Sequence, residues 1–294
     1  QTTYERINRE MHRGHGVQDS IDANRRLRDS GFKVGFHMMP GQPGMSEEMC
    51  LEDFRRIFSD PDWRPDYLKI YPTLIVEGTA TYDMWHRGDY EPLGNEQAAE
   101  LVAEIKSMIP KYTRLQRVQR DIPADFIEAG VWKSNLRQLA RKRMDEHGWT
   151  CDCIRCREVG MNDEDPEQIE LDVREYEVSG GRKHFISFED PEKDLLVGFC
   201  RLRFPNDPVR RELDDAALVR ALHVYGSQVG VGQQSEDDQH QHRGYGRRLL
   251  EKAEELAIEG GYEKLAVLSG IGVREYYREK LGYKQDGPYV SKRL

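Results

Sequence analysis

Hydrophobic positions in the first third of the chain follow helical spacing and strand spacing in alternation. Small and apolar residues recur at helical spacing from Gln18 to Asp29, and Gly31 ends this predicted helix. A buried strand is expected at 32–39, followed by a helix that Ser46 can cap, and another strand at 67–71. This alternation is typical of a parallel α/β sheet or barrel, and about two such units are too few to close a barrel.

The middle of the chain continues with helical patterns and then becomes basic. Residues 95–109 form an amphipathic helix that Pro110 ends, and Leu115 with Val118 marks a short edge strand. Residues 134–146 place apolar side chains on one stripe and basic side chains on its flank, so a helix with a cationic face is expected. Three closely spaced cysteines follow this helix.

From about residue 168 the pattern changes to short alternating strands. Strands are expected at 169–178, 183–188, 195–203 and 219–225, then a helix at 247–259, a strand at 264–268, a short helix at 273–280 and a last strand near Tyr283. The pattern predicts an antiparallel meander that opens an α+β domain. We therefore expect three regions: an α/β region at 1–110, a basic, cysteine-rich linker at 111–167 and an α+β domain at 168–294.

Composition and charge limit the class of protein. The 294 residues suffice for two domains, and 37% hydrophobic with 33% charged residues is typical of a globular protein. There is no long apolar run and no signal-peptide core in Gln1 to Arg13, so we expect no membrane segment and a cytoplasmic location. The net charge of −9 argues against a generic nucleic-acid binder. Residues 111–157, however, carry eleven basic and six acidic side chains, which indicates either a polyanion-binding surface or a solvated helix face.

A glycine-rich turn precedes the helix at 247–259 and follows a strand. Glycines allow a close backbone approach, and the free N–H groups at a helix start attract a pyrophosphate, although a plain tight turn is the alternative. The turn and the later Tyr-Tyr-Arg-Glu-Lys-Leu-Gly-Tyr resemble the acyl-coenzyme A loop and closing helix of the GNAT acetyltransferases. The resemblance implies acetyl-coenzyme A binding by the turn, made of Gln241, His242, Arg243, Gly244, Tyr245, Gly246 and Arg247, and by the preceding strand, which includes Leu222, His223 and Val224.

Two tyrosines and one histidine are candidates for the acetyl-transfer chemistry. Tyr276 and Tyr277 are adjacent on a helix and face about 100 degrees apart, so one is expected to pack in the core. The other can present its phenol to the thioester or the departing thiolate. His223 can act as a base, although the alternation around it favours a structural histidine with a satisfied partner.

Cys151, Cys153 and Cys156 hold three of the five cysteines within six residues. In a reducing compartment this density favours a metal over disulfides, and we expect structural zinc. His147 is the nearest candidate for a fourth ligand and Cys200 a distant one, while three reduced thiols are the alternative. An iron–sulfur cluster fits less well, because the Cys-x-x-x-Cys-x-x-Cys spacing of radical enzymes is missing.

The whole chain resembles the catalytic-subunit family of Elongator, the tRNA uridine acetyltransferases. The resemblance is carried by Asn8-Arg9-Glu10, Arg13-Gly14-His15, Phe36 to Gly44, Tyr71-Pro72-Thr73-Leu74, Arg117 to Pro123, Leu222 to Gly226 and Gly287-Pro288-Tyr289. It implies the C-terminal part of a radical S-adenosylmethionine (β/α) barrel at 1–110 and a GNAT acetyltransferase domain at 168–294. It also implies a radical reaction in which acetyl-coenzyme A supplies a carboxymethyl-type group to carbon 5 of the tRNA wobble uridine.

The chain departs from the family at its cluster motif and first barrel strands, neither of which it contains. We therefore expect an N-terminally trimmed piece that binds acetyl-coenzyme A and tRNA without completing the reaction, with S-adenosylmethionine and a [4Fe–4S] cluster only in the full-length protein. Expected partners are tRNA and either Elongator-type accessory subunits or a second copy of the chain. The alternatives are a protein (histone) lysine acetyltransferase and a noncatalytic RNA-binding scaffold. Phosphate contacts are assigned to Arg117, Arg120, Lys133, Arg137, Arg141 and Lys142.

Overall fold

The computed structural model describes residues 1–119, 122–226 and 244–294, and these residues form two compact units. The first unit comprises residues 1–22 and 34–155, and the second comprises 23–33 and 156–294. Residues 111–155 thus pack with the first unit and 156–167 with the second. The domain limits predicted at residues 110 and 167 do not coincide with the limits of these compact units. The division into three domains stays a prediction.

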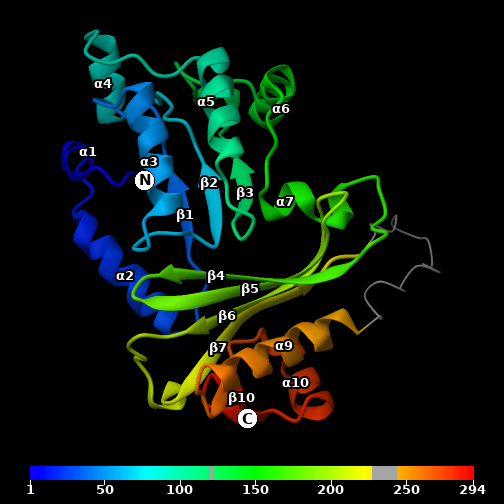
Figure 1. Cartoon of the computed structure of the whole chain (residues 1–294). Coiled ribbons are helices and arrows are strands. Elements are labelled where there is room, and N and C mark those ends of the chain that lie inside the picture. The colour runs from blue at the N-terminus through cyan, green and yellow to red at the C-terminus, as the bar shows by residue number, and fades with distance from the viewer. Residues whose placement is uncertain (120–121, 227–243) are drawn as a thin grey trace. The chain divides into compact units, whose positions relative to one another are not determined.

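The first unit contains an open parallel sheet with the strand order β1-β2-β3 (Figure 1). Its strands are β1 (Gly35–Met38), β2 (Tyr67–Ile70) and β3 (Arg114–Val118). Its helices are α1 (Glu5–Glu10), the start of α2 (Val17–Asp29), α3 (Glu47–Ser59), α4 (Ala80–His86), α5 (Asn95–Ser107) and α6 (Leu136–His147). The expected partial barrel is therefore confirmed as alternating strands and helices, with β3 at the edge.

Local sequence explains several of these elements. Ser46 caps α3 as expected, because its side chain accepts a hydrogen bond from the Met49 N–H at 3.2 Å. Gly35 stands opposite Tyr67 in the β1–β2 register, and a Cβ at this position would lie 2.0 Å from the tyrosine ring. Only glycine fits there. Helices α1 and α4 were not anticipated, since six and seven residues are too few to reveal a helical period.

The second unit is built on a seven-stranded sheet with the order β4-β5-β6-β7-β8-β10-β9. The strands are β4 (Glu170–Val178), β5 (Gly181–Asp190), β6 (Leu195–Phe204), β7 (Ala216–Val224), β8 (Lys264–Val267), β9 (Lys284–Asp286) and β10 (Tyr289–Arg293). All neighbouring pairs are antiparallel except β7 and β8, which are parallel. The predicted meander is confirmed. Strand β10 was not anticipated, and it lies between β8 and β9.

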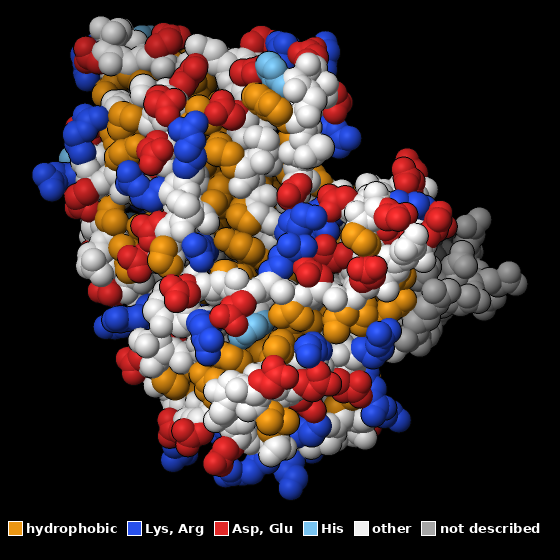
Figure 2. All heavy atoms as spheres, in the orientation of Figure 1, with side chains coloured by type: hydrophobic (Ala, Val, Ile, Leu, Met, Phe, Trp, Pro, Cys, Tyr) orange, Lys and Arg blue, Asp and Glu red, His pale blue; other side chains and the backbone are white. Residues whose placement is uncertain are grey.

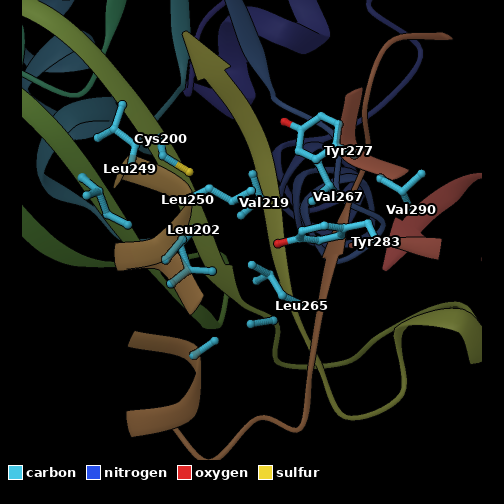
Figure 3. Packing of buried hydrophobic residues seen from close by; sticks show 14 of the residues in the cluster. Cys200, Leu202, Val219, Leu249, Leu250, Leu265, Val267, Tyr277, Tyr283 and Val290 are labelled. Atoms are coloured by element: carbon cyan, nitrogen blue, oxygen red, sulfur yellow. The ribbon is translucent and has the colours of Figure 1, made fainter. Parts of the chain in front are cut away.

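Two helices of this unit, α9 (Tyr245–Glu259) and α10 (Arg274–Lys280), accompany its sheet (Figure 1). The apolar stripe of α9, including Leu249, Leu250 and Ala253, packs on Cys200, Leu202 and Val219 of the sheet, and the same core takes in Tyr277 and Tyr283 (Figure 3). A short helix, α7 (Ile154–Arg157), contains the limit between the two units, which falls between residues 155 and 156. None of the helices in the described ranges is both long and apolar enough to cross a membrane.

The C-terminal half of α2 belongs to the second unit, although its sequence lies within the predicted barrel region. Asp29 and Arg203 form a buried ion pair, with 2.7 Å between Oδ1 and Nε. Asp29 also accepts a hydrogen bond from the Asp207 N–H at 3.1 Å. Arg203 in turn donates to the carbonyl oxygens of Val178 and Ser179. Residues 23–33 are thereby anchored to β6 and to the turn between β4 and β5.

Candidate active site in the second unit

Strand β8 pairs with the first half of β7 only, and β7 continues beyond the end of β8. They pair from Ala216 with Lys264 to Val219 with Val267, and a last bond joins the Leu268 N–H to the Val219 carbonyl. Ala221 interrupts β7 with a φ of 92°, where the β6–β7 register also shifts. Beyond this bulge, β7 continues to Val224 beside β6 but without β8 as a partner. Beyond Val219 the β8 side of β7 therefore has no paired strand among the described residues, and we call this side of β7 the opening between β7 and β8.

The free edge of β7 presents backbone groups to this opening. The Tyr225 N–H donates to the Val197 carbonyl at 2.8 Å, so Tyr225 turns its backbone toward β6. Because backbone groups alternate along an antiparallel strand, those of His223 also face β6, and those of Leu222 and Val224 face the opening. The side chains of Leu222 and Val224 pack against the core, which puts the His223 side chain on the other face of the sheet.

The N-terminus of α9 lies beside the end of β7. Gly244 is the N-cap residue with a φ of 76°, a left-handed conformation that suits glycine. A Cβ at Gly246 would lie 3.6 Å from Val224 Cγ2, so the helix start adjoins the free edge of β7. Within the described residues, Tyr245 is buried against Phe188, and Arg247 is exposed and paired with Glu251 at 2.8 Å. Gln241, His242 and Arg243 lie outside the described residues.

The two candidate tyrosines of α10 have different environments. Tyr277 is 5% exposed and packs edge-on against Tyr283, with 5.6 Å between ring centroids, whereas Tyr276 is 47% exposed. Burial raises the pKa of Tyr277 well above that of a free phenol. Its phenol therefore stays protonated at neutral pH and can donate a hydrogen bond. Figure 3 shows its hydroxyl at the end of the ring that points toward β7.

The three clustered cysteines are close enough to share a metal ion. The Sγ atoms of Cys151, Cys153 and Cys156 all lie within 4.8 Å of one another, and Cys153 is buried. No other described His, Cys, Asp or Glu belongs to this group. His147, the expected nearest ligand, instead places its Nε2 2.7 Å from Glu100 Oε1, and Cys200 is buried in the second unit's core. Neither of the two suggested fourth ligands joins the cluster.

The basic residues assigned to RNA differ in exposure. Arg141 and Lys142 are exposed on α6 and pair with Asp145 and Glu146 one turn on, and Arg117 is exposed on β3. Lys133 is half-buried, and its Nζ lies 4.0 Å from Glu96 Oε1.

Arg137 is also half-buried, and its guanidinium donates to the Leu115 carbonyl at 3.3 Å, which ties α6 to β3. Arg120 lies outside the described residues. On the face seen in Figure 2, basic and acidic side chains are interspersed. The cationic face of α6 is therefore partly neutralised, because its own acidic residues and those of α5 accompany it.

The first unit also contains a cavity that the sequence did not identify. It has a volume of about 360 Å³ and is lined mainly by apolar residues that follow β1 and β2, among them Met39, Pro72 and Leu74. His37 and Tyr71 also line it and meet edge-on, with 4.1 Å between ring centroids. The available signal was the position of these residues at the carboxyl ends of parallel strands, where ligands of α/β sheets commonly bind.

Comparison with known families supports both halves of the fold. The Radical_SAM C-terminal domain matches residues 65–146, and the Acetyltransferase (GNAT) family matches residues 149–283. These matches confirm the predicted fold class, a partial radical S-adenosylmethionine barrel followed by a GNAT domain.

Individual relatives match over the full length of the chain. A tRNA uridine(34) acetyltransferase of Methanocaldococcus jannaschii is 50% identical over 100% of this chain and 56% of its own length. Elongator complex protein 3 of Saccharomyces cerevisiae is 44% identical over 100% of this chain and 54% of its own. The chain thus spans about half the length of the curated relatives it matches.

A solved structure extends the agreement to three dimensions. The archaeal Methanocaldococcus infernus Elp3 with an N-terminal deletion superimposes with a TM-score of 0.95 at 48% identity, over 100% of this chain and 71% of that one. Identity at this level over the whole chain, together with the same fold, shows common descent. The chain belongs to the Elongator complex protein 3 family, whose archaeal members include the tRNA uridine(34) acetyltransferases.

Proposed function

We propose that this chain carries the acetyl-coenzyme A site and part of the RNA-binding surface of a tRNA wobble-uridine acetyltransferase. The observation that carries the proposal is the opening between β7 and β8, which adjoins the N-terminus of α9. A free strand edge and the N–H groups of a helix start are complementary to the amide-containing arm and the pyrophosphate of coenzyme A. The relatives' names supply the substrate class, a tRNA uridine.

In this proposal each element of the site has one task. The backbone groups of Leu222 and Val224 pair with the pantetheine arm, and the N–H groups that follow Gly244 receive the pyrophosphate. When bound, the coenzyme supplies an acetyl group activated as a thioester. Tyr277 donates a hydrogen bond from its protonated phenol to the thioester, since its raised pKa excludes a role as a base at neutral pH. Tyr276 is assigned no chemical step.

We propose the radical part of the reaction for the whole protein of this family. We do not assign its iron–sulfur cluster to the clustered cysteines of this chain. Their Cys-x-Cys-x-x-Cys spacing differs from the Cys-x-x-x-Cys-x-x-Cys of radical enzymes, so they do not fit that iron–sulfur cluster. S-adenosylmethionine and a [4Fe–4S] cluster therefore remain part of the proposal for the whole protein only. The same holds for Elongator-type accessory subunits and for a homodimer.

Hydrolysis of acetyl-coenzyme A by the full chain, measured with and without tRNA, tests the proposed function. Turnover that tRNA stimulates supports it. Transfer of the acetyl group to a histone peptide, with no stimulation of turnover by tRNA, favours a protein lysine acetyltransferase. Binding of tRNA and coenzyme without turnover favours a noncatalytic scaffold.

Zinc is our proposal for the cysteine cluster. We expect elemental analysis to find roughly one zinc per chain, and zinc to raise the melting temperature, because metal binding contributes to folding free energy. Cys153→Ser removes the buried ligand and is expected to abolish this dependence on zinc. The dependence on zinc is the decisive measurement, since losing a buried thiol also changes packing. A metal-free chain whose melting temperature zinc and chelators leave unchanged would contradict the assignment.

For RNA binding, Arg141 is a sharper test position than Arg137, because Arg137 holds α6 to β3. We expect Arg141→Glu to weaken binding of every tRNA and to lower the slope of log K against log salt by about one for each phosphate that the variant no longer neutralises. Arg293→Glu is the matched control, since Arg293 is an exposed, ion-paired arginine in the second unit. Equal effects of the two changes in a filter-binding titration would remove Arg141 from the RNA surface.

A further inference from the structure

Three aromatic side chains form a continuous layer on β6 and β7, which we call the aromatic shelf: Phe199, His223 and Tyr225. Phe199 and His223 are direct partners in the β6–β7 register, with 5.4 Å between ring centroids. The rings of His223 and Tyr225 are nearly parallel, at 12°, with centroids 6.5 Å apart. His223 is exposed and Tyr225 is half-buried, whereas Phe199 is buried and supports them from β6.

A buried cation underlies this layer. The Arg201 guanidinium lies 4.7 Å from the centroid of the Phe199 ring and 5.7 Å from that of Phe185, and Arg201 is 5% exposed. Phe185 in turn stacks on Phe199, with 5.1 Å between centroids. The shelf is therefore a set of rings that packs against Phe185 and the Arg201 guanidinium.

The shelf borders the opening between β7 and β8 from the face opposite Tyr277. His223 alternates with Leu222 and Val224, whose side chains lie in the core that contains Tyr277. A group held in the opening thus has the tyrosine on one face of the sheet and the shelf on the other.

We infer that the aromatic shelf is the acceptor site and that it takes a planar nucleobase, stacked on His223 and Tyr225. This inference rests on the proposed function and adds the residues that select the acceptor. Unstacked RNA bases bind by stacking on aromatic rings and guanidinium planes, and the parallel rings of His223 and Tyr225 offer such aromatic faces to a planar pyrimidine.

The test uses the full chain and an anticodon stem-loop RNA with 2-aminopurine at the wobble position. All four tryptophans of the chain lie in the first unit, at positions 63, 85, 132 and 149, so the shelf itself adds no tryptophan emission. Stacking on the shelf is expected to quench the 2-aminopurine fluorescence. His223→Leu and Tyr225→Leu are expected to abolish the quenching and to weaken binding roughly five- to 150-fold, the range measured for loss of one base–aromatic stack.

Two controls separate stacking from other effects. Tyr225→Phe keeps the ring and is expected to retain the quenching, and Arg141→Glu is expected to weaken binding while leaving the quenching at saturation intact. Unchanged fluorescence and affinity in both leucine variants would overturn this inference alone. Absence of RNA binding by the unaltered chain would overturn the proposed function as well. Loss of histone-peptide binding in the leucine variants, with RNA binding unchanged, would overturn the inference in favour of a protein acceptor.

Discussion

Replacing Tyr277 with phenylalanine is expected to slow tRNA-stimulated hydrolysis of acetyl-coenzyme A by about two to three orders of magnitude. Loss of one positioned donor to a reacting carbonyl oxygen costs on the order of 3 to 4 kcal/mol in the transition state. The donor here is a phenol whose pKa burial raises, so it carries its proton throughout the neutral range. The remaining ring keeps its edge-on packing against Tyr283, and we therefore expect the fold to survive.

The neighbouring tyrosine provides the matched control for this substitution. Tyr276→Phe removes the same hydroxyl from the adjacent, half-exposed position on α10 and is expected to leave turnover nearly unchanged. Affinity for acetyl-coenzyme A, measured by calorimetry, is expected to stay within a few fold in both variants, because the proposed coenzyme contacts are made by the backbone of β7 and the N-terminus of α9. If Tyr277→Phe hydrolyses acetyl-coenzyme A at the rate of the unaltered chain, the Tyr277 hydroxyl has no role in turnover and the residue serves only in packing. A large loss confined to Tyr276→Phe would transfer the role to its neighbour.

Replacing Asp29 with asparagine is expected to lower the free energy of unfolding of the second unit by about 3 to 5 kcal/mol. Removing one partner of a buried ion pair leaves the other charge buried without compensation. Asp29 is wholly buried and Arg203 is 4% exposed, and the two groups approach to 2.6 Å. Arg203 keeps its bonds to two carbonyl oxygens, but these are neutral and do not replace the lost carboxylate.

Hydrogen exchange of the β5 and β6 amides measures this effect in the second unit itself. The four tryptophans all lie in the first unit and do not report on it. Glu263→Gln is the control, since it neutralises one partner of the exposed Arg293–Glu263 pair and is expected to change stability by about 1 kcal/mol or less. If the β6 amides are equally protected in the two variants, the buried Asp29–Arg203 pair stabilises the second unit no more than the exposed Arg293–Glu263 pair does.

Local sequence was informative wherever a short segment contains its own structural signal. The strands from β4 to β7 and helix α9 follow from alternation and from helical spacing, and the Ser46 cap follows from the preference of serine for that position. The spacing of Cys151, Cys153 and Cys156 also sufficed to predict a three-sulfur cluster. Each of these features depends on residues only a few positions apart.

Other parts of the site depend on residues that are distant in the sequence. His147 was the natural fourth ligand by proximity along the chain, but Glu100 on α5 engages its ring. Arg137 resembled the other cations of α6, but the Leu115 carbonyl on β3 binds its guanidinium. Single-sequence patterns do not contain these partners, since they say which face of a helix is polar but not what that face meets.

The sequence by itself determined that an α/β region precedes an α+β domain, because hydrophobic period and turn residues are local properties, and the resemblance of its motifs to known families indicated a partial barrel and an acetyltransferase fold. It also offered Tyr276 and Tyr277 as the two candidates for a phenol donor. Only the tertiary structure showed that their environments differ, with Tyr277 buried beside Tyr283 and Tyr276 half-exposed, and only it joined Asp29 to Arg203, 174 positions away. It likewise inserted β10 between β8 and β9. The physical reason is that burial, strand order and ion pairing arise from contacts between distant segments, and these exist only once the chain has folded.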